Sequence, residues 1–223
     1  AGVGAGAGIY VLGTTTEARV GNFAKVGNAF NAGSLLIKAS DASTLIAVAG
    51  AAGAGGTAGA GAGVAVGVIN KSITAEIGAS TLVEVGNVIV DAKSAESLFN
   101  ITAGVGVGGT AGLAGAVTVL AVNPTTTARI GAGSRVFADG NVAVLADSKT
   151  EIDMLDGAFA AGGSGGIGAS IGVTVIDATT LATVDTNAQV TALSNGADQS
   201  FITGYGTNFA DYGADDGFTA ADF

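Results

Sequence analysis

Small and apolar residues alternate along several tracts of the chain with a period of two, not the 3.6 of a helix. In the tract 162–175, Gly162, Gly166 and Gly172 occupy one set of alternate positions, while Ile171 and Val173 occupy the other. The tract 59–68 repeats this pattern. Because successive side chains of a β-strand point to opposite faces, each tract predicts a strand with one face of tiny residues and one apolar face.

A second alternating element recurs as Gly33-SLLIKAS, Gly86-NVIVDAKS and Gly140-NVAVLADS. Its β-branched residues predict short strands, each entered through a turn. The alternation also changes phase once, which predicts a bulge or bend near Gly108 and Gly109.

Both elements belong to repeating units of the chain. Four units align on the anchors Gly21, Gly78, Gly131 and Asp185, which lie 57, 53 and 54 residues apart. In the fourth unit the second element has decayed to VTALSNGADQS, so we expect the array to end near residue 200. The chain is therefore divided into a repetitive segment, residues 1–200, and a non-repeat acidic and aromatic tail, residues 201–223.

Repeats of this kind stack strands about 4.8 Å apart, so that each rung satisfies the backbone hydrogen bonds of the next. We expect an all-β stack with rows of Val, Ile and Leu inside, and with Gly and Ala at narrow corners and close approaches. At roughly 20–30 residues per rung, each repeat would supply about two rungs. Open rung ends are adhesive unless they are capped, so we expect head-to-tail polymerisation.

The order of these elements resembles a known family. The run Thr125-TTARIG, followed by Gly140-NVAVLADS and preceded by Gly/Ala/Val alternation, resembles the repeats of very large bacterial exoproteins. These are filamentous-haemagglutinin-like and leukotoxin-type filamentous adhesins and autotransporter passengers. The resemblance covers roughly residues 1–200 and implies a right-handed parallel β-helix (β-solenoid) of about four repeats of about 54 residues. It also implies export to the bacterial surface as a stalk, adhesin or matrix fibre. The glycine tracts are longer than is usual there, and the tail has no counterpart.

A membrane alternative rests on the stretch from Leu45 to Asn70, which carries no charge and exceeds the roughly 20 residues of a membrane-spanning helix. Its small-xxx-small spacing, Gly55–Gly59–Gly63, favours close helix packing. Glycine disfavours helices, however, and the pattern alternates. We expect no transmembrane segment, with a glycine-zipper membrane protein as the alternative.

Composition excludes several classes of function. The chain has no Cys and no His, which removes disulfides, Cys nucleophiles and the commonest general base, so we expect no enzyme. Its net charge of −10 argues against nucleic acid. Residues 1–149 are neutral, whereas the chain from Glu151 onward holds ten acidic residues and no basic one. This segment predicts a solvated acidic surface, a divalent-cation site or an electrostatic end-to-end contact.

Two acidic groups are candidate sites. Glu151, Asp153 and Asp156 lie in a stretch that we interpret as a loop, either solvated or a weak cation site. The tail offers oxygen ligands among glycines that suit calcium, the one cofactor we consider. These are Asp211, Asp215, Asp216 and Asp222. Its aromatic residues are candidates for joining a neighbouring subunit by strand addition. They are Tyr205, Phe209, Tyr212, Phe218 and Phe223. A frayed tail is the remaining interpretation.

The expected function is a structural or adhesive segment of a secreted bacterial surface fibre, whose partners are copies of itself and a host or matrix surface. The alternative is a calcium-dependent surface binding module. Since Ala1 begins within an alternating run and no signal sequence is visible, we expect an internal fragment or a processed product.

Overall fold

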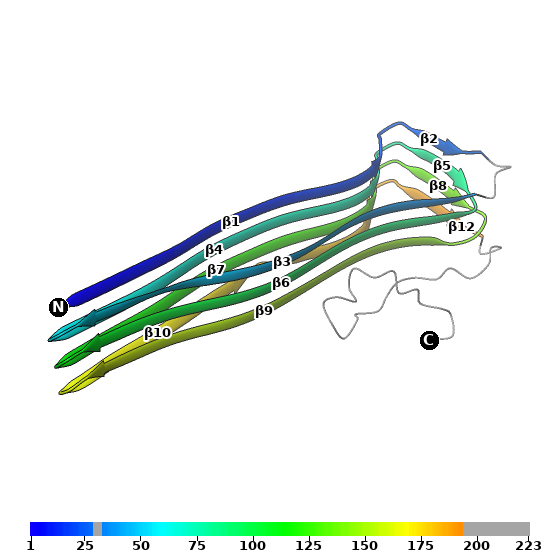
Figure 1. Cartoon of the computed structure of the whole chain (residues 1–223). Helices are drawn as coiled ribbons and strands as arrows, with labels where there is room; N and C mark the ends of the chain where they lie inside the picture. Colours follow the sequence, from blue (N-terminus) through cyan, green and yellow to red (C-terminus); the bar gives the residue numbers. More distant parts are fainter. Residues whose placement is uncertain (29–32, 194–223) are drawn as a thin grey trace.

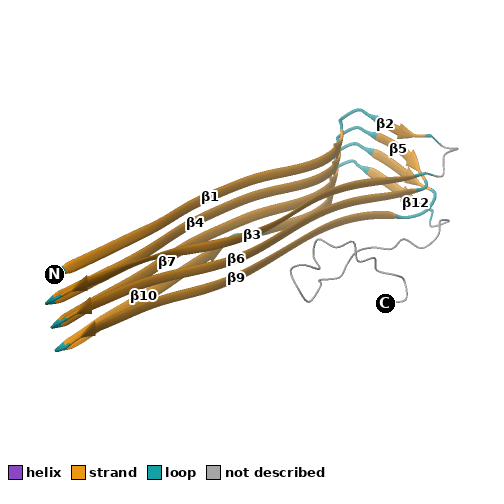
Figure 2. Cartoon of the chain, viewed as in Figure 1, coloured by secondary structure: helices purple, strands orange, loops and turns teal. Residues whose placement is uncertain are grey.

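The computed structural model describes residues 1–28 and 33–193. These residues form twelve strands and no helix, and the strands pair in parallel within three sheets. Figure 2 shows long strands joined by short turns. The prediction of an all-β fold with parallel strands in stacked sheets is confirmed. Among the described residues there is also no helix that is long and apolar enough to cross a membrane.

Two sheets are long and one is short (Figure 1). Sheet A contains β1 (Gly2–Val20), β4 (Ala58–Ile77), β7 (Ala111–Ile130) and β10 (Gly165–Ile176), with β11 (Thr179–Val184) also paired to β7. Sheet C contains β3 (Ser34–Gly55), β6 (Asn87–Gly108) and β9 (Val142–Gly162). Sheet B contains β2 (Lys25–Gly27), β5 (Leu82–Val85), β8 (Arg135–Ala138) and β12 (Gln189–Ala192), and it joins sheets A and C at one end only.

The strand register follows the repeat. Gly2 pairs with Gly59, Ala58 with Ala111, and Ala111 with Gly165, so one turn of the chain consumes one whole repeat. The expectation of about two rungs per repeat is therefore wrong. The segments expected to be short strands continue as strands of 21 or 22 residues, so a single rung absorbs the repeat.

Each rung turns from sheet A towards sheet B at an equivalent corner. Phe23, Ser80, Gly133 and Asn187 all have positive φ, between 56° and 69°. Such a conformation is unfavourable for most side chains and is tolerated best by Gly and Asn. The backbone bonds nevertheless continue through the corners, as Phe23 N–H donates to Ala79 O and Ser80 N–H donates to Ala132 O, both at 2.9 Å.

At the far end, sheets A and C turn directly into one another, and their glycine faces meet. A Cβ placed on Gly61 would overlap the carbonyl oxygen of Val105, and one on Gly106 would overlap that of Leu113. Only glycine permits backbones to approach this closely. The expectation that Val and Ile rows fill the interior is therefore wrong for this half: glycine lies inside and the apolar face points outward. We call this half the flat end.

The half beside sheet B has the interior that was expected. Its core is made of aliphatic side chains from all three sheets, including Ile77, Val83, Val90 and Ile130, all fully buried. A second cluster, formed around Ile69, Leu98, Leu120 and Val122, lies between this core and the flat end. The bend predicted near Gly109 is confirmed, because Gly109 lies in the turn between β6 and β7.

Candidate assembly surfaces

A column of charges crosses the outer surface of sheet A near sheet B. Arg19 on β1 pairs in register with Glu76 on β4, which pairs with Arg129 on β7. Arg129 Nη2 lies 2.5 Å from Glu76 Oε2, and its Nη1 lies 3.8 Å from Asp185 Oδ2, just beyond β11. The residue in register with Arg129 on the last rung is Thr183, and Asp185 lies diagonally, two residues further on. The signs alternate from Arg19 to Glu76, Arg129 and Asp185, and neighbours of opposite sign attract one another. We call Arg19, Glu76, Arg129 and Asp185 the charged column.

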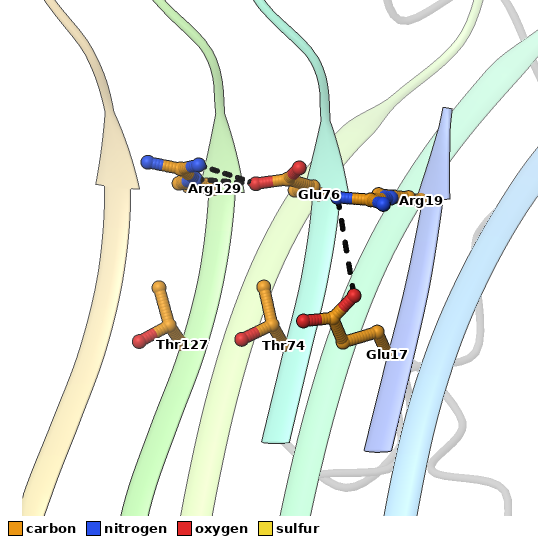
Figure 3. A pocket seen from close by; sticks show the side chains of 6 residues that line it. All are labelled: Glu17, Arg19, Thr74, Glu76, Thr127 and Arg129. Carbon is orange, nitrogen blue, oxygen red and sulfur yellow. Dashed lines mark hydrogen bonds and ion pairs between the residues drawn. The ribbon is translucent and has the colours of Figure 1, made fainter. Parts of the chain in front are cut away.

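The charged column borders a shallow pocket in sheet A, drawn in Figure 3. Arg129 and Glu76 point toward one another across neighbouring strands, whereas Arg19 faces Glu17 on its own strand at 3.9 Å. The remaining lining comes from Thr74 and Thr127. Each carboxylate here faces a guanidinium, so the pocket holds paired charges rather than a free acid or base for catalysis.

A buried ionic cluster lies inside the stack between the two cores. Lys71 on β4 has a fully buried side chain, and its Nζ lies 3.1 Å from Glu96 Oε1 on β6. Lys71 also pairs with Asp41 on β3, and it donates to Ser43 Oγ at 3.2 Å and to the Ala95 carbonyl at 3.3 Å. The cluster joins three strands of two sheets. A buried charge needs such partners, because desolvation penalises it.

Asp41 lies on β3, in the open first rung, whereas Glu96 lies on β6, in the second rung. Partial burial acts to raise the pKa of Asp41, but the hydrogen bond and positive charge of Lys71, with bonds from Ser43 and Thr16, outweigh burial and hold that pKa below its usual value. Asp41 is therefore ionised in the folded state at neutral pH.

A second interior polar group lies closer to the flat end. Thr118 on β7 donates to Thr102 Oγ1 at 2.7 Å or to Asp156 Oδ1 at 2.5 Å. Nearby, burial raises the pKa of the Tyr10 hydroxyl, although a hydrogen bond with Asn100 acts to lower it. Thr118, Thr102 and Asp156 thus bond across strands, whereas the buried side-chain nitrogen of Asn100 has no hydrogen-bond partner.

Both ends of the stack expose an incomplete core. The half-buried members of the larger core lie on the first rung, on the last rung, or on β9, the last described strand of sheet C: Ala18, Val20, Val26, Leu35, Val142, Val144, Ala146 and Ala188. The second cluster behaves likewise, with Tyr10, Leu12 and Leu45 at one end and Ile152 and Met154 at the other. The strands β1, β2 and β3 end their sheets on one side, and β9, β10 and β12 end them on the other.

The outer surface of sheet A at the flat end is apolar. It carries twenty residues in five columns that run across the rungs, and every one is Gly, Ala, Val, Leu or Ile. Several are largely exposed, including Val3 (81%), Ile9 (75%) and Ile167 (71%). A contiguous exposed apolar patch of this kind marks an interaction surface. We call it the apolar face of sheet A.

Of the two acidic sites predicted from the sequence, one lies within a strand and the other lies outside the described residues. Glu151, Asp153 and Asp156 lie within β9, so their interpretation as a loop is wrong. Glu151 and Asp153 are exposed, while Asp156 is partly buried and bonds Thr118 from the other face of the strand. They are not brought together as ligands. The candidate tail residues lie outside the described residues, namely Asp211, Asp215, Asp216, Asp222, Tyr205, Phe209, Tyr212, Phe218 and Phe223.

Among the described residues, no group of three or more acidic side chains is placed to hold a metal ion. Comparison with known proteins gives no match to any family model, curated protein or solved structure. Function must therefore be inferred from the surfaces of the chain itself.

Sequence reasoning missed the charged column and the buried ionic cluster. The column could have been found, because Arg19, Glu76 and Arg129 each lie two residues before an anchor glycine of the repeat. The position of Lys71 carries a weaker signal: in β4 it shares its face with Ile69 and Ile73, an unusual place for a lysine.

Proposed function

We propose that this chain is a structural segment of a β-solenoid fibre, in which each open end is continued by a further rung of the same kind. The observation that carries the proposal is the incomplete core at both ends. Half-buried aliphatic rows on the first strands of the sheets and on β9, the last described strand of sheet C, would be covered by further strands just as the inner strands cover one another. Burying them would contribute about 25 cal/mol per Å² of apolar surface.

The charged column supports head-to-tail continuation over the other two ways of joining ends. Asp185 ends the column on one side and Arg19 ends it on the other. A head-to-tail joint places Arg19 of the next unit beside Asp185, so the alternation of sign continues. In a head-to-head or tail-to-tail joint the abutting strands would run antiparallel, so full overlap would place Arg19 or Asp185 against the flat end of the other copy, without a partner of opposite charge.

The proposed joint pairs specific strands of the two units. It pairs β1 of the next unit with β10 and β11, and β2 of the next unit with β12. Sheet C needs one further strand there, between β9 and β3 of the next unit, since sheet A has a β10 level for which the described residues supply no sheet C strand.

The proposal for the whole fibre rests on the resemblance of the repeats to those of large bacterial exoproteins. The fibre is a right-handed parallel β-helix of about four repeats of about 54 residues per chain. It belongs to a secreted protein of the bacterial surface, with a structural or adhesive role. Open ladders and small-residue packing suit a long rod.

Complementary charge variants test the joint. Arg19→Asp places a like charge diagonally across the joint from Asp185 of the neighbour, and Asp185→Lys places one diagonally across from Arg19. Each variant alone is expected to assemble at least tenfold more slowly than the wild type in light scattering and electron microscopy. Mixed in equal amounts, the two variants are expected to co-assemble, because the introduced carboxylate of one copy then meets the introduced ammonium group of the other.

The control is Arg135→Asp, which makes the same change of charge on the third strand of sheet B, flanked by β5 and β12 rather than at an open end. It is expected to assemble like the wild type. A wild-type chain that stays monomeric at high concentration, or a mixture that assembles no better than its components, would contradict the proposal.

A further inference from the structure

The apolar face of sheet A is not flat, because columns of large side chains alternate with a column of small ones. Its columns run along the stack, at right angles to the strands. The second column contains only small residues, Ala5, Ala62, Gly115 and Ala169, and lies between two columns of larger ones. The first is Val3, Ala60, Leu113 and Ile167, and the third is Ala7, Val64, Val117 and Ile171.

The small-residue column is therefore the floor of a shallow apolar groove. Ala5, Ala62 and Gly115 line it, with Val3, Leu113 and Ile167 along its rim. Beside it, the third column rises as a ridge, with Ile171 60% exposed and Val117 38% exposed. A groove and a parallel ridge of the same spacing on one face are complementary to the same face of another copy.

We propose that the apolar face of sheet A is a lateral interface between two copies of this chain, in which the third-column ridge of each copy packs into the second-column groove of the other. The two copies are related by a two-fold axis parallel to the stack. Each copy thus presents the same patch, as in an isologous dimer. Because the axis runs along the stack, both fibres point the same way and the interface lengthens with every added unit.

The area of the apolar face is large enough for an interface with a second copy of the chain. Five columns at about 6.8 Å and four rungs at about 4.8 Å cover about 650 Å² per copy. A pair would bury about 1,300 Å², near the lower limit of about 1,200 Å² for specific protein–protein interfaces. No charged or polar side chain lies in the patch, so its burial leaves no side-chain charge unpaired. This interface goes beyond the end-to-end joint and does not depend on it.

Gly115 offers a direct test. A side chain added there meets no atom of the chain closer than the Ala169 carbonyl oxygen at 4.0 Å, so Gly115→Val fills the groove without disturbing the fold. Gly13→Val is the matched control: it adds the same side chain to the same sheet, also without a contact, in the neighbouring column outside the patch. Gly157→Val makes the change on the outer surface of sheet C.

In sedimentation velocity, Gly115→Val is expected to weaken lateral association at least tenfold, while Gly13→Val and Gly157→Val leave it unchanged. If Gly115→Val associates like the wild type, or if Gly157→Val alone reduces association, the interface is wrong. Loss of binding to phosphatidylcholine vesicles by Gly115→Val, with self-association unchanged, would assign the face to lipid and overturn the proposal.

A cysteine cross-link separates this interface from the end-to-end joint, since the chain has no cysteine of its own. Val117→Cys lies about 12 Å from its equivalent, because the facing sheets are about 10 Å apart and the two third columns are offset by one column, but about 19 Å from it along a stack of four rungs. A short bis-maleimide is expected to link Val117→Cys pairs and not Thr125→Cys pairs, whose residue lies on the same strand outside the patch. Equal yields from both cysteines would contradict lateral packing, whatever the result at the joint.

Discussion

The ammonium group of Lys71 lies 3.1 Å from the Glu96 carboxylate, and both side chains are almost completely buried inside the stack. They come from sheets A and C and lie between two apolar clusters. An ion pair here stabilises the fold only as a complete unit, because each charge would be costly if it were buried alone. The cluster also favours one register, since a slip of one residue would move either charge to the other face of its strand.

Lys71→Met should therefore destabilise the chain by about 3–5 kcal/mol, as expected when one partner of a buried pair is removed. Lys71→Met combined with Glu96→Met should be closer to the wild type than Lys71→Met alone. Urea unfolding followed by circular dichroism measures both. A single variant no less stable than the double would show that Glu96 is not left uncompensated.

Acid should weaken the fold through Asp41. Its folded pKa lies below the unfolded value of about 3.9, so the stabilisation is complete above that value and is lost as the pH falls through the folded pKa. Thermal unfolding of the wild type and of Asp41→Asn should thus differ at neutral pH and converge at low pH. Parallel curves between pH 6 and pH 2 would exclude this role.

The glycines of the flat end should differ sharply in tolerance. Gly61→Ala forces a Cβ against the Val105 carbonyl and should cost about 1–3 kcal/mol, as overpacking does. Gly13→Ala, which points into open space, should be neutral or stabilise by about 0.5–1 kcal/mol, because alanine loses less entropy on folding. Chemical denaturation of the two variants compares them, and equal stabilities would refute glycine-to-backbone packing.

The corner at Phe23 is strained. This exposed aromatic residue has a φ of 59°, and the equivalent corner of the last rung has Asn187. Phe23→Asn should stabilise the chain by about 1 kcal/mol, because asparagine tolerates the left-handed region far better. The melting temperature should rise. A fall would mean that Phe23 makes contacts that outweigh the strain.

The repeat was readable from the sequence because the similar spacing of Gly21, Gly78 and Gly131 reflects stacking in register. In the structure, Gly78 N–H donates to Val20 O and Gly131 N–H to Ile77 O, so the anchor glycines occupy equivalent positions. Alternation predicted the strands for the same reason. The number of rungs per repeat was predicted wrongly because a rung was taken to need roughly 20–30 residues, whereas strands of about 20 residues make one rung as long as the repeat. Polar residues such as Glu151 and Asp153 likewise suggested a loop where an exposed strand face continues.

The orientation of the glycine tracts could not be predicted from hydropathy. Packing Val64 and its neighbours inward would hold the sheets about 10 Å apart. The chain instead passes from β3 to β4 through only Gly56 and Thr57, and the sheets close on their glycines. The length of that turn, together with the repeat, determines which face is buried.

The central claim is that open rungs are continued by rungs of other copies. Electron cryo-microscopy of the concentrated wild-type chain tests it most directly. The account predicts filaments with strands perpendicular to the filament axis, a rung spacing of about 4.8 Å, and β10 of one copy beside β1 of the next. Particles limited to single chains or to laterally paired chains, with β1 and β10 both uncovered, would contradict it.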